Sequence, residues 1–315
     1  MTAARQRVLV LGGSGFVGRH LAAKLAAAGH EVVVITRRRE RARHLLLLPT
    51  VEVVEGDPYD RAVLARCAVG ATAAVNLVGV LHERGRQSFE RAHVELPGLL
   101  VAACKSAGIT RVLHMSALGA GADAPSRYLQ SKAAGEAAID ASGLAWTLFR
   151  PSVIFGPEDT FLNLFAKLSR LLPVIALAGA NARFQPVYVG DVAACMAAAL
   201  CDDETSGQRY DLCGPSVYTL EQLVRYVGEV VGARRPIVPL GPALSSLQAW
   251  VMEWLPGPLL TRDNLRSMQR DSVCDCPFPS KFRIAPSPIE AIAPGWLAPD
   301  SRISRFDTYR EQSGR

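Results

Sequence analysis

A serine, a tyrosine and a lysine have the types and the spacing needed for proton transfer. Tyr128 and Lys132 stand four residues apart in a segment with a helical pattern, so both side chains project from one helix face. A tyrosine and a lysine at this spacing are common by chance, but Ser116 ends the preceding strand pattern. Its hydroxyl can hydrogen-bond a substrate carbonyl or hydroxyl, and the lysine ammonium lowers the cost of ionising the phenol. We therefore expect Ser116, Tyr128 and Lys132 to be catalytic.

Three glycines lie between the first strand pattern and the first helical pattern. Gly12, Gly15 and Gly18 are spaced three residues apart. In such a loop the first glycine permits a tight turn, the second lets the backbone approach a pyrophosphate, and the third lets helix and strand pack closely. A flexible turn without a ligand is the alternative, but the position between strand and helix favours a dinucleotide site. The expected contacts are Gly12, Ser14, Gly15, Phe16, Val17 and Gly18.

Basic residues stand where the second strand is expected to end. A site for NAD(H) usually has an acidic residue there, to hold the ribose 2′-hydroxyl. This chain has Arg37 and Arg38, and no carboxylate before Glu40. Both arginines can pair with a 2′-phosphate, so NADP(H) is the expected cofactor and NAD(H) the alternative. A solvated basic helix face is the other interpretation, and it is the one we prefer for Arg41 and Arg43.

Asp57 follows the third strand pattern directly. Its carboxylate can accept a hydrogen bond from the adenine amino group. A helix N-cap or a turn explains the residue equally well.

The elements that must position these residues alternate between strand and helix. This rhythm predicts a doubly wound parallel α/β sheet of the Rossmann type, with ligands at the carboxyl ends of the strands. The strand candidates are Val8–Leu11, Glu31–Ile35, Val51–Glu55, Ala73–Val78, Arg111–Ser116 and Ala145–Phe149. The helix candidates are Phe16–Ala28, Arg39–Leu48, Arg61–Ala68, Phe89–Ala107 and Arg127–Ala141.

The rhythm changes after Pro151, and prolines become frequent from Arg234 onward. We expect a smaller C-terminal α+β lobe for substrate or partner binding. The nucleotide-binding domain is assigned to residues 1–156 and about 184–213, and the smaller lobe to about 157–183 and 214–315. Within that lobe Thr219 is expected to be the N-cap of an amphipathic helix.

Composition and charge exclude several classes of protein. A net charge of +6 over 315 residues is modest, so no nucleic-acid partner is expected. The seven cysteines offer no zinc spacing, and we expect reduced thiols in a cytoplasmic protein. No apolar stretch is long enough to span a bilayer, so the protein is expected to be soluble or at most peripheral to a membrane. For the apolar segment Leu247–Trp254, core packing is favoured over docking on a membrane or a partner.

Together these motifs resemble the extended or atypical short-chain dehydrogenase/reductase superfamily. The resemblance covers residue 7 to about 213 as an ordered set. Within this superfamily, the chain resembles the branch that holds the NAD(P)H-binding accessory subunit of respiratory complex I and its bacterial relatives. Three segments carry this closer resemblance: Ser116–Gly119, Arg127–Lys132 and Phe155–Asn163. The motifs that carry the resemblance to the superfamily are Gly12-x-x-Gly15-x-x-Gly18, Asn76–Gly79, Ser116, Tyr128-x-x-x-Lys132, Arg150–Pro157 and Pro186–Ala193.

The resemblance implies further roles. Tyr128 would be the acid/base, Lys132 would hold the ribose and tune Tyr128, and Ser116 would orient the substrate. Asn76 and Gly79 would line the cofactor cleft, and the backbone from Pro151 to Val153 would approach the nicotinamide. A strand-end turn at Asn76 and a strand terminator at Pro151 are the alternatives.

The segment between Ser116 and Tyr128 differs from that of sugar-nucleotide epimerases, and this difference affects which substrate can bind. Sugar-nucleotide epimerases usually carry a long insert between the serine and the tyrosine, whereas eleven residues separate Ser116 from Tyr128 here. Two functions therefore stay open. One is an NADP(H)-dependent oxidoreductase or epimerase for an unidentified small molecule. The other is a non-catalytic cofactor-binding or sensing subunit of a respiratory assembly, associated with that complex or with the inner membrane.

Overall fold

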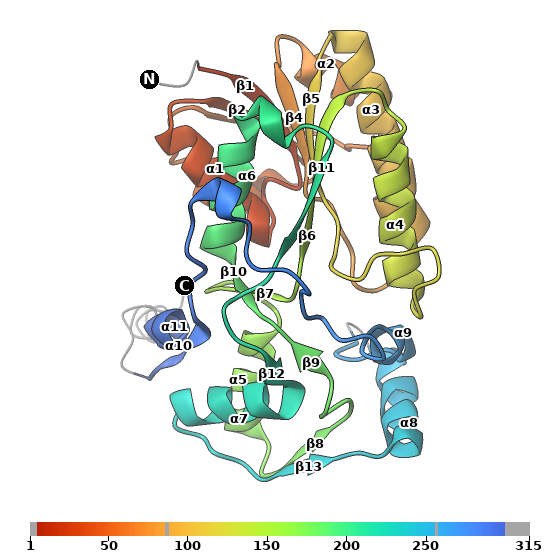
Figure 1. The fold of residues 1–315 in the computed structure, drawn as a ribbon, viewed down its shortest axis with the longest axis vertical. Coiled ribbons are helices and arrows are strands. Elements are labelled where there is room, and N and C mark those ends of the chain that lie inside the picture. Colours follow the sequence, from red (N-terminus) through yellow and green to blue (C-terminus); the bar gives the residue numbers. More distant parts are fainter. Residues whose placement is uncertain (1–4, 86–87, 256–257, 300–315) are drawn as a thin grey trace. The chain divides into compact units, whose positions relative to one another are not determined.

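The computed structural model describes residues 5–85, 88–255 and 258–299, and the chain forms two compact units (Figure 1). The first unit comprises residues 1–151, 189–212 and 279–284; the second comprises 152–188, 213–278 and 285–315. This division differs from the sequence-based one at 152–156, 184–188, 213 and 279–284. Residues 300–315 of the expected smaller lobe lie outside the described residues.

The first unit is built on a seven-stranded sheet in which every pairing is parallel. Most of its strands are apolar runs with few charges, as expected for strands covered on both faces. The doubly wound α/β prediction is confirmed. In spatial order the strands are β11 (Gln208–Leu212), β6 (Ala145–Pro151), β5 (Arg111–Met115), β4 (Ala73–Asn76), β1 (Arg7–Leu11), β2 (Glu31–Thr36) and β3 (Val51–Glu55).

Helices cover both faces of this sheet (Figure 1). On one face α1 (Phe16–Ala27) packs against α6 (Val189–Leu200). The other face carries α2 (Arg61–Ala68), α3 (Leu96–Ala107) and α4 (Arg127–Asp140).

Two expected helices differ from the α-helix that the sequence predicts. The segment 39–48 forms a 3₁₀ helix over Arg39–Leu45, and 89–107 begins with a π-helical turn, Arg91–Glu95, before α3. That turn passes close to α4, where the carbonyl oxygen of His93 approaches Gly135.

Strand register brings the predicted site residues to one edge of the sheet. Leu11 pairs with Asn76, and Asn76 pairs with His114. The residues that follow each of them therefore lie at the carboxyl edge, which places the glycine loop and Ser116 on the same side. Strand order reverses at β1, between β4 and β2, which is where ligands bind in open α/β sheets.

The second unit is smaller and mixes short strand pairs with helices, which confirms the α+β lobe. Its core includes Phe155, Leu223, Val227 and Trp296. The strand pairs are β7 (Ile154–Phe155) with β10 (Val187–Tyr188), β9 (Arg183–Phe184) with β12 (Tyr218–Thr219), and β8 (Ile175–Leu177) with β13 (Ile237–Pro239). The helices are α5 (Leu162–Leu171), α7 (Leu220–Val230), α8 (Pro242–Glu253), α9 (Arg262–Ser267), α10 (Ile289–Ile292) and α11 (Pro294–Leu297).

Two local features of this unit test expectations from the sequence. Thr219 caps α7 and forms a capping box with Gln222, as expected. The expectation that every cysteine is a free thiol is wrong, because Cys213 and Cys274 form a disulfide. The pair is 61 residues apart in sequence, so no local spacing signals it.

The apolar segment Leu247–Trp254 lies largely in α8, and Ala249 is its one buried residue. Trp250 is 47% and Trp254 77% exposed, so the expectation of core packing is wrong. In the described part of the chain, no helix is both long enough and apolar enough to cross a membrane.

Two helical glycines give a matched test of the packing between α4 and the π-helical turn. A methyl group at Gly135 would lie 2.1 Å from the carbonyl oxygen of His93, whereas one at Gly98 of α3 would meet open space. We expect Gly135→Ala to lower the free energy of unfolding by about 1–3 kcal/mol or more through overpacking. Gly98→Ala should raise it by about 0.5–1 kcal/mol, because alanine favours the helix. Urea unfolding of both variants checks this, and equal effects would contradict it.

Candidate active site

The glycine loop at the end of β1 is shaped for close backbone approach. Gly12 has a φ of +80°, and its carbonyl accepts a hydrogen bond from the Gly15 N–H at 3.0 Å. A methyl group at Gly18 would lie 2.2 Å from the Gly12 carbonyl oxygen. One at Gly12 would lie 3.0 Å from the carbonyl carbon of Leu77. Side chains at positions 12 and 18 would therefore force the helix away from the strand edge.

The start of α1 leaves its backbone donors available. Gly15 is the N-cap and provides no side-chain cap, and the first turn holds no acidic residue. Ser14, Phe16 and Val17 are all half-buried around this turn. Free N–H groups at the positive end of a helix dipole bind phosphate well, so the loop fits a dinucleotide pyrophosphate.

Arg37 and Arg38 follow β2 directly, and both are exposed. The Thr36 hydroxyl donates to the Arg38 carbonyl at 3.1 Å, which shapes the turn into the 3₁₀ helix. Within the described ranges neither guanidinium has a carboxylate partner. Both side chains are therefore available to an anionic group at the end of β2.

Asp57 adopts the turn role that the sequence left open. Its carboxylate accepts a hydrogen bond from the Tyr59 N–H at 3.1 Å, and its carbonyl accepts one from the Asp60 N–H at 3.0 Å. Asp60, rather than Asp57, is the N-cap of α2. The contact from Asp57 to an adenine stays a prediction.

Asn76 is fully buried at the end of β4 and has both ends of its amide engaged. Its oxygen accepts from the Val78 N–H at 3.1 Å, and its nitrogen lies 3.1 Å from Nδ1 of His114. The amide therefore donates to Nδ1, which places the His114 proton on Nε2. The turn role of Asn76 is thus present, and it fixes the loop that faces Gly12.

His93 connects the loop after β4 to the helix that carries the tyrosine. Its Nε2 accepts from the Val80 N–H at 3.1 Å, and its Nδ1 lies 2.8 Å from the Ser131 hydroxyl. Ser131 donates to the Tyr128 carbonyl at 2.7 Å, so the histidine must donate to Ser131 from Nδ1. The His93 and Tyr128 rings pack edge to face, with centroids 5.6 Å apart.

Lys132 is buried at the same edge of the sheet. Its ammonium donates to the Met115 carbonyl at 3.2 Å. A methyl group at Gly79 would lie 3.1 Å from the Lys132 nitrogen, so the glycine makes room for the ammonium group. The structure therefore brings together Lys132, Gly79 and the end of β5, one residue before Ser116.

Ser116 and Tyr128 occupy different environments. The Ser116 backbone N–H donates to the Phe149 carbonyl at 2.8 Å, and its buried hydroxyl has no hydrogen-bond partner among the described residues. Tyr128 is half-buried and packs beside Ala117, Ala124 and Leu129. A buried, unsatisfied hydroxyl is costly, so Ser116 is poised to bond a ligand.

Burial shifts the pKa values of the tyrosine and the lysine in opposite senses. It raises the pKa of Tyr128 to about 12 and lowers the pKa of Lys132 to about 8. The upward shift at Tyr128 is opposite to the one expected from a nearby ammonium, because removal of the phenol from water disfavours the phenolate. Glu136 lies one helical turn after Lys132 and pairs with Arg150. Its negative charge raises the pKa of Lys132 and so partly offsets the effect of burial.

Pro151 and Val153 lie in different units. Pro151 ends β6 in the first unit, and its carbonyl accepts from the Leu118 N–H at 2.9 Å. Val153 belongs to the second unit, where its carbonyl accepts from the Val187 N–H at 3.0 Å. The nicotinamide contact of this segment stays a prediction.

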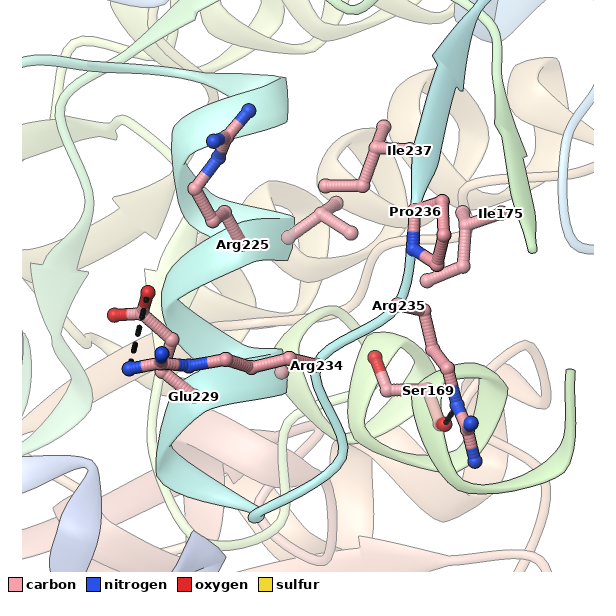
Figure 2. A pocket seen from close by; sticks show the side chains of 10 residues that line it. Ser169, Ile175, Arg225, Glu229, Arg234, Arg235, Pro236 and Ile237 are labelled. Atoms are coloured by element: carbon pink, nitrogen blue, oxygen red, sulfur yellow. Dashed lines mark hydrogen bonds and ion pairs between the residues drawn. The ribbon is translucent and has the colours of Figure 1, made fainter. Parts of the chain in front are cut away.

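A cavity of about 360 Å³ lies within the second unit (Figure 2) and is lined by none of the predicted site residues. Its arginines are already engaged. Arg225 pairs with Glu221 on α7. Arg234 pairs with Glu229, and Arg235 donates to the Ser169 carbonyl (Figure 2). We assign it no ligand.

Sequence reasoning missed two residues that position the site. His93 and Ser131 link the loop after β4 to the backbone of Tyr128, yet they are 38 residues apart in sequence. Ser131 lies inside the Tyr-x-x-x-Lys motif, and its partner could not be found from spacing. His114 is likewise buried, against Asn76 at the end of β4.

Comparison with known families gives one match that spans most of the chain. Residues 12–203 match the family described as NAD(P)H-binding. The matched segment contains the glycine loop, Asn76, Ser116, Tyr128 and Lys132.

Two curated relatives are similar in sequence. The chain is 36% identical over 263 residues to NADH dehydrogenase [ubiquinone] 1 alpha subcomplex subunit 9, mitochondrial, of Arabidopsis thaliana, covering 79% of this chain and 65% of that protein. It is 32% identical over 260 residues to a protein named ceramide reductase of Caulobacter vibrioides, covering 80% of each. The chain thus spans slightly less than two thirds of the plant relative.

A solved structure shares the fold. The dTDP-glucose 4,6-dehydratase DesIV of Streptomyces venezuelae, determined with NAD and TYD bound, superposes with a TM-score of 0.65 at 24% identity. The match covers 74% of this chain and 84% of that one.

The two buried histidines should make stability fall in mild acid. Burial, with the charge of Lys132 nearby, lowers the pKa of His93 to about 2 and that of His114 to about 3. In the unfolded chain both titrate near about 6.5, so their contribution is complete above that pH and is lost as pH falls below it. We expect the free energy of unfolding to decrease by up to about 1.4 kcal/mol per pH unit for each histidine.

Urea unfolding between about pH 7 and about pH 5 measures this dependence. His93→Gln should reduce the pH slope, because glutamine does not take up a proton in the unfolded chain. A slope insensitive to His93→Gln would show that this histidine is not held neutral by the fold.

Proposed function

Because this chain belongs to the NAD(P)H-binding family, within the short-chain dehydrogenase/reductase superfamily, we propose that it is an NADP(H)-dependent oxidoreductase for a small carbonyl compound. The buried Ser116 hydroxyl, which lacks a partner among the described residues, carries this proposal. It stands at the sheet edge that also holds the glycine loop and the Lys132 ammonium. A substrate oxygen at that position would satisfy the hydroxyl.

The side chains support reduction by proton donation. When bound, NADPH supplies a hydride to the carbonyl carbon. The Tyr128 hydroxyl donates its proton to the carbonyl oxygen, which becomes an alcohol, and Ser116 donates a hydrogen bond to the same oxygen. Because burial raises the pKa of Tyr128 to about 12, the phenol carries its proton at neutral pH. Lys132, when charged, stabilises the phenolate that is left.

The substrate is expected to be a carbonyl compound rather than a nucleotide sugar. The eleven residues between Ser116 and Tyr128 leave no room for the insert that helps sugar-nucleotide epimerases form their pocket. The reductase name of the Caulobacter relative also favours reduction over epimerisation.

NADP(H) is the proposed cofactor, held by the glycine loop, with Asn76 and Gly79 beside the cleft that would receive it. Arg37 and Arg38 would pair with its 2′-phosphate, since both are exposed at the end of β2 and neither has a carboxylate partner among the residues described. Asp57, Pro151 and Val153 are the proposed contacts to the adenine and the nicotinamide.

A second candidate function is that of a non-catalytic NAD(P)H-binding subunit of a respiratory complex, peripheral to the inner membrane. The name of the Arabidopsis relative favours it. Fluorescence of the purified protein with NADPH, followed over hours with a panel of carbonyl compounds, separates the two. Oxidation by any compound supports the enzyme, and a cofactor that stays reduced with all of them supports the subunit.

Tyr128→Phe removes the proposed proton donor while it keeps the ring that packs on His93. We expect turnover to fall about 100-fold or more, with NADPH affinity nearly unchanged. Tyr210→Phe, on β11, is the matched control and should turn over like the wild type. Steady-state kinetics of both variants check this, and full activity in Tyr128→Phe would rule out the proposed acid.

The cofactor preference is tested with Arg37→Ala combined with Arg38→Ala. Loss of charge-assisted hydrogen bonds should weaken NADPH binding about 10- to 100-fold or more and leave NADH binding nearly unchanged. Arg41→Ala with Arg43→Ala is the control, because both arginines are exposed in the same basic segment. Fluorescence titration gives the dissociation constants. An equal loss for both cofactors would remove the preference for NADP(H).

A further inference from the structure

The second unit carries most of the exposed large apolar side chains of the described chain. Twelve of the sixteen such residues lie in it. Seven of the twelve are on α8 or in the segment that follows it: Leu244, Leu247, Trp250, Val251, Trp254, Leu255 and Leu259. We call these seven residues the α8 face.

The spacing within α8 aligns these side chains along one side of the helix. Leu247, Trp250 and Trp254 follow one another at intervals of three and four residues, and the two indoles pack edge to face with centroids 6.2 Å apart. The opposite side of the helix holds Ser245 and Ala249, which are buried. The α8 face is therefore the outer side of a helix already fixed to its own unit.

Apart from the indole N–H groups of Trp250 and Trp254, the side chains of the α8 face cannot form hydrogen bonds. No charged residue occurs between Arg235 and Glu253, a run that includes nearly all of α8. Protein interfaces carry about one hydrogen bond per 100–200 Å² and have polar rims. A lipid surface needs no such bonds, and tryptophan is enriched where a bilayer meets water.

Arginines and carboxylates lie together beside the α8 face, where Glu253, Asp263 and Asp271 stand among three arginines. Arg262 of α9 pairs with Glu253 at the end of α8, at 2.9 Å, which holds the two helices together. Arg266 and Arg270 follow on and just after α9. Neither forms a salt bridge in the described ranges, although the charge of Arg266 also acts on Glu253. Cations next to an apolar helix face complement the negative surface of an anionic membrane.

We propose that the α8 face docks on the surface of a bilayer that contains anionic phospholipids. The Trp and Leu side chains enter the boundary between headgroups and acyl chains, while Arg266 and Arg270 contact lipid phosphates. This inference does not depend on whether the protein is a reductase or a respiratory subunit. It concerns peripheral binding, consistent with the absence of a spanning helix in the described residues.

Vesicle flotation of the full-length protein tests the proposal. The wild type should float with vesicles of equal parts phosphatidylglycerol and phosphatidylcholine, and its tryptophan emission should shift to shorter wavelength. Leu247→Ser with Trp254→Ser should weaken binding about 100-fold, roughly tenfold for each buried side chain. Arg266→Gln with Arg270→Gln should weaken it about fivefold for each arginine.

Leu47→Ser is the matched control, because Leu47 is 85% exposed in the first unit and should not affect flotation. Each variant is checked by thermal unfolding and by NADPH titration, so a folding defect is separated from a docking defect. The proposal is overturned if the wild type does not float, or if the double serine variant floats as well as the wild type. A wild-type dimer in place of vesicle binding, lost in the serine variant, would assign the face to a second copy of this chain.

Discussion

A buried ammonium group at Lys132 constrains the carboxyl edge of the sheet. Removing a charge from water is costly unless other groups compensate it, and burial here lowers the lysine pKa to about 8. The Met115 carbonyl accepts from the ammonium, and Glu136 lies one turn further along the same helix. Gly79 leaves the space that the amine occupies. His93, close by, stays neutral, so no second positive charge adds to the first.

The parts of this arrangement set by local chemistry could be predicted from the sequence. Apolar runs between helical segments specify a parallel sheet, and β1 ends at glycines because Gly12 and Gly18 lie against backbone atoms. The four-residue spacing of Tyr128 and Lys132 places them on one helix, as predicted. Once β4 and β5 pair in parallel, their register places Asn76 beside His114, and no other sequence motif is needed for this.

Other parts depend on long-range packing and could not be predicted. The bond from His93 to Ser131 joins two elements whose separation in sequence carries no pattern. The pKa of Tyr128 rises because of burial, which spacing does not report. The exposure of Trp254 is likewise decided by which side of α8 faces the core, and that segment is apolar on most sides. When a helix has more apolar surface than its neighbours can cover, its composition does not tell which of its apolar residues are buried.

The disulfide between Cys213 and Cys274 turns α7, α8 and α9 into a closed ring of chain. Closing a loop of 61 residues restricts the unfolded chain by an amount worth about 4 kcal/mol in the entropic model. That cost grows only with the logarithm of loop length, about 0.6 kcal/mol for each doubling in a flexible chain. A short insertion in an exposed loop inside the ring therefore changes the contribution of the disulfide only slightly, as long as both cysteines stay paired. The buried side chains of α7, rather than the closure of the ring, limit where its length can change.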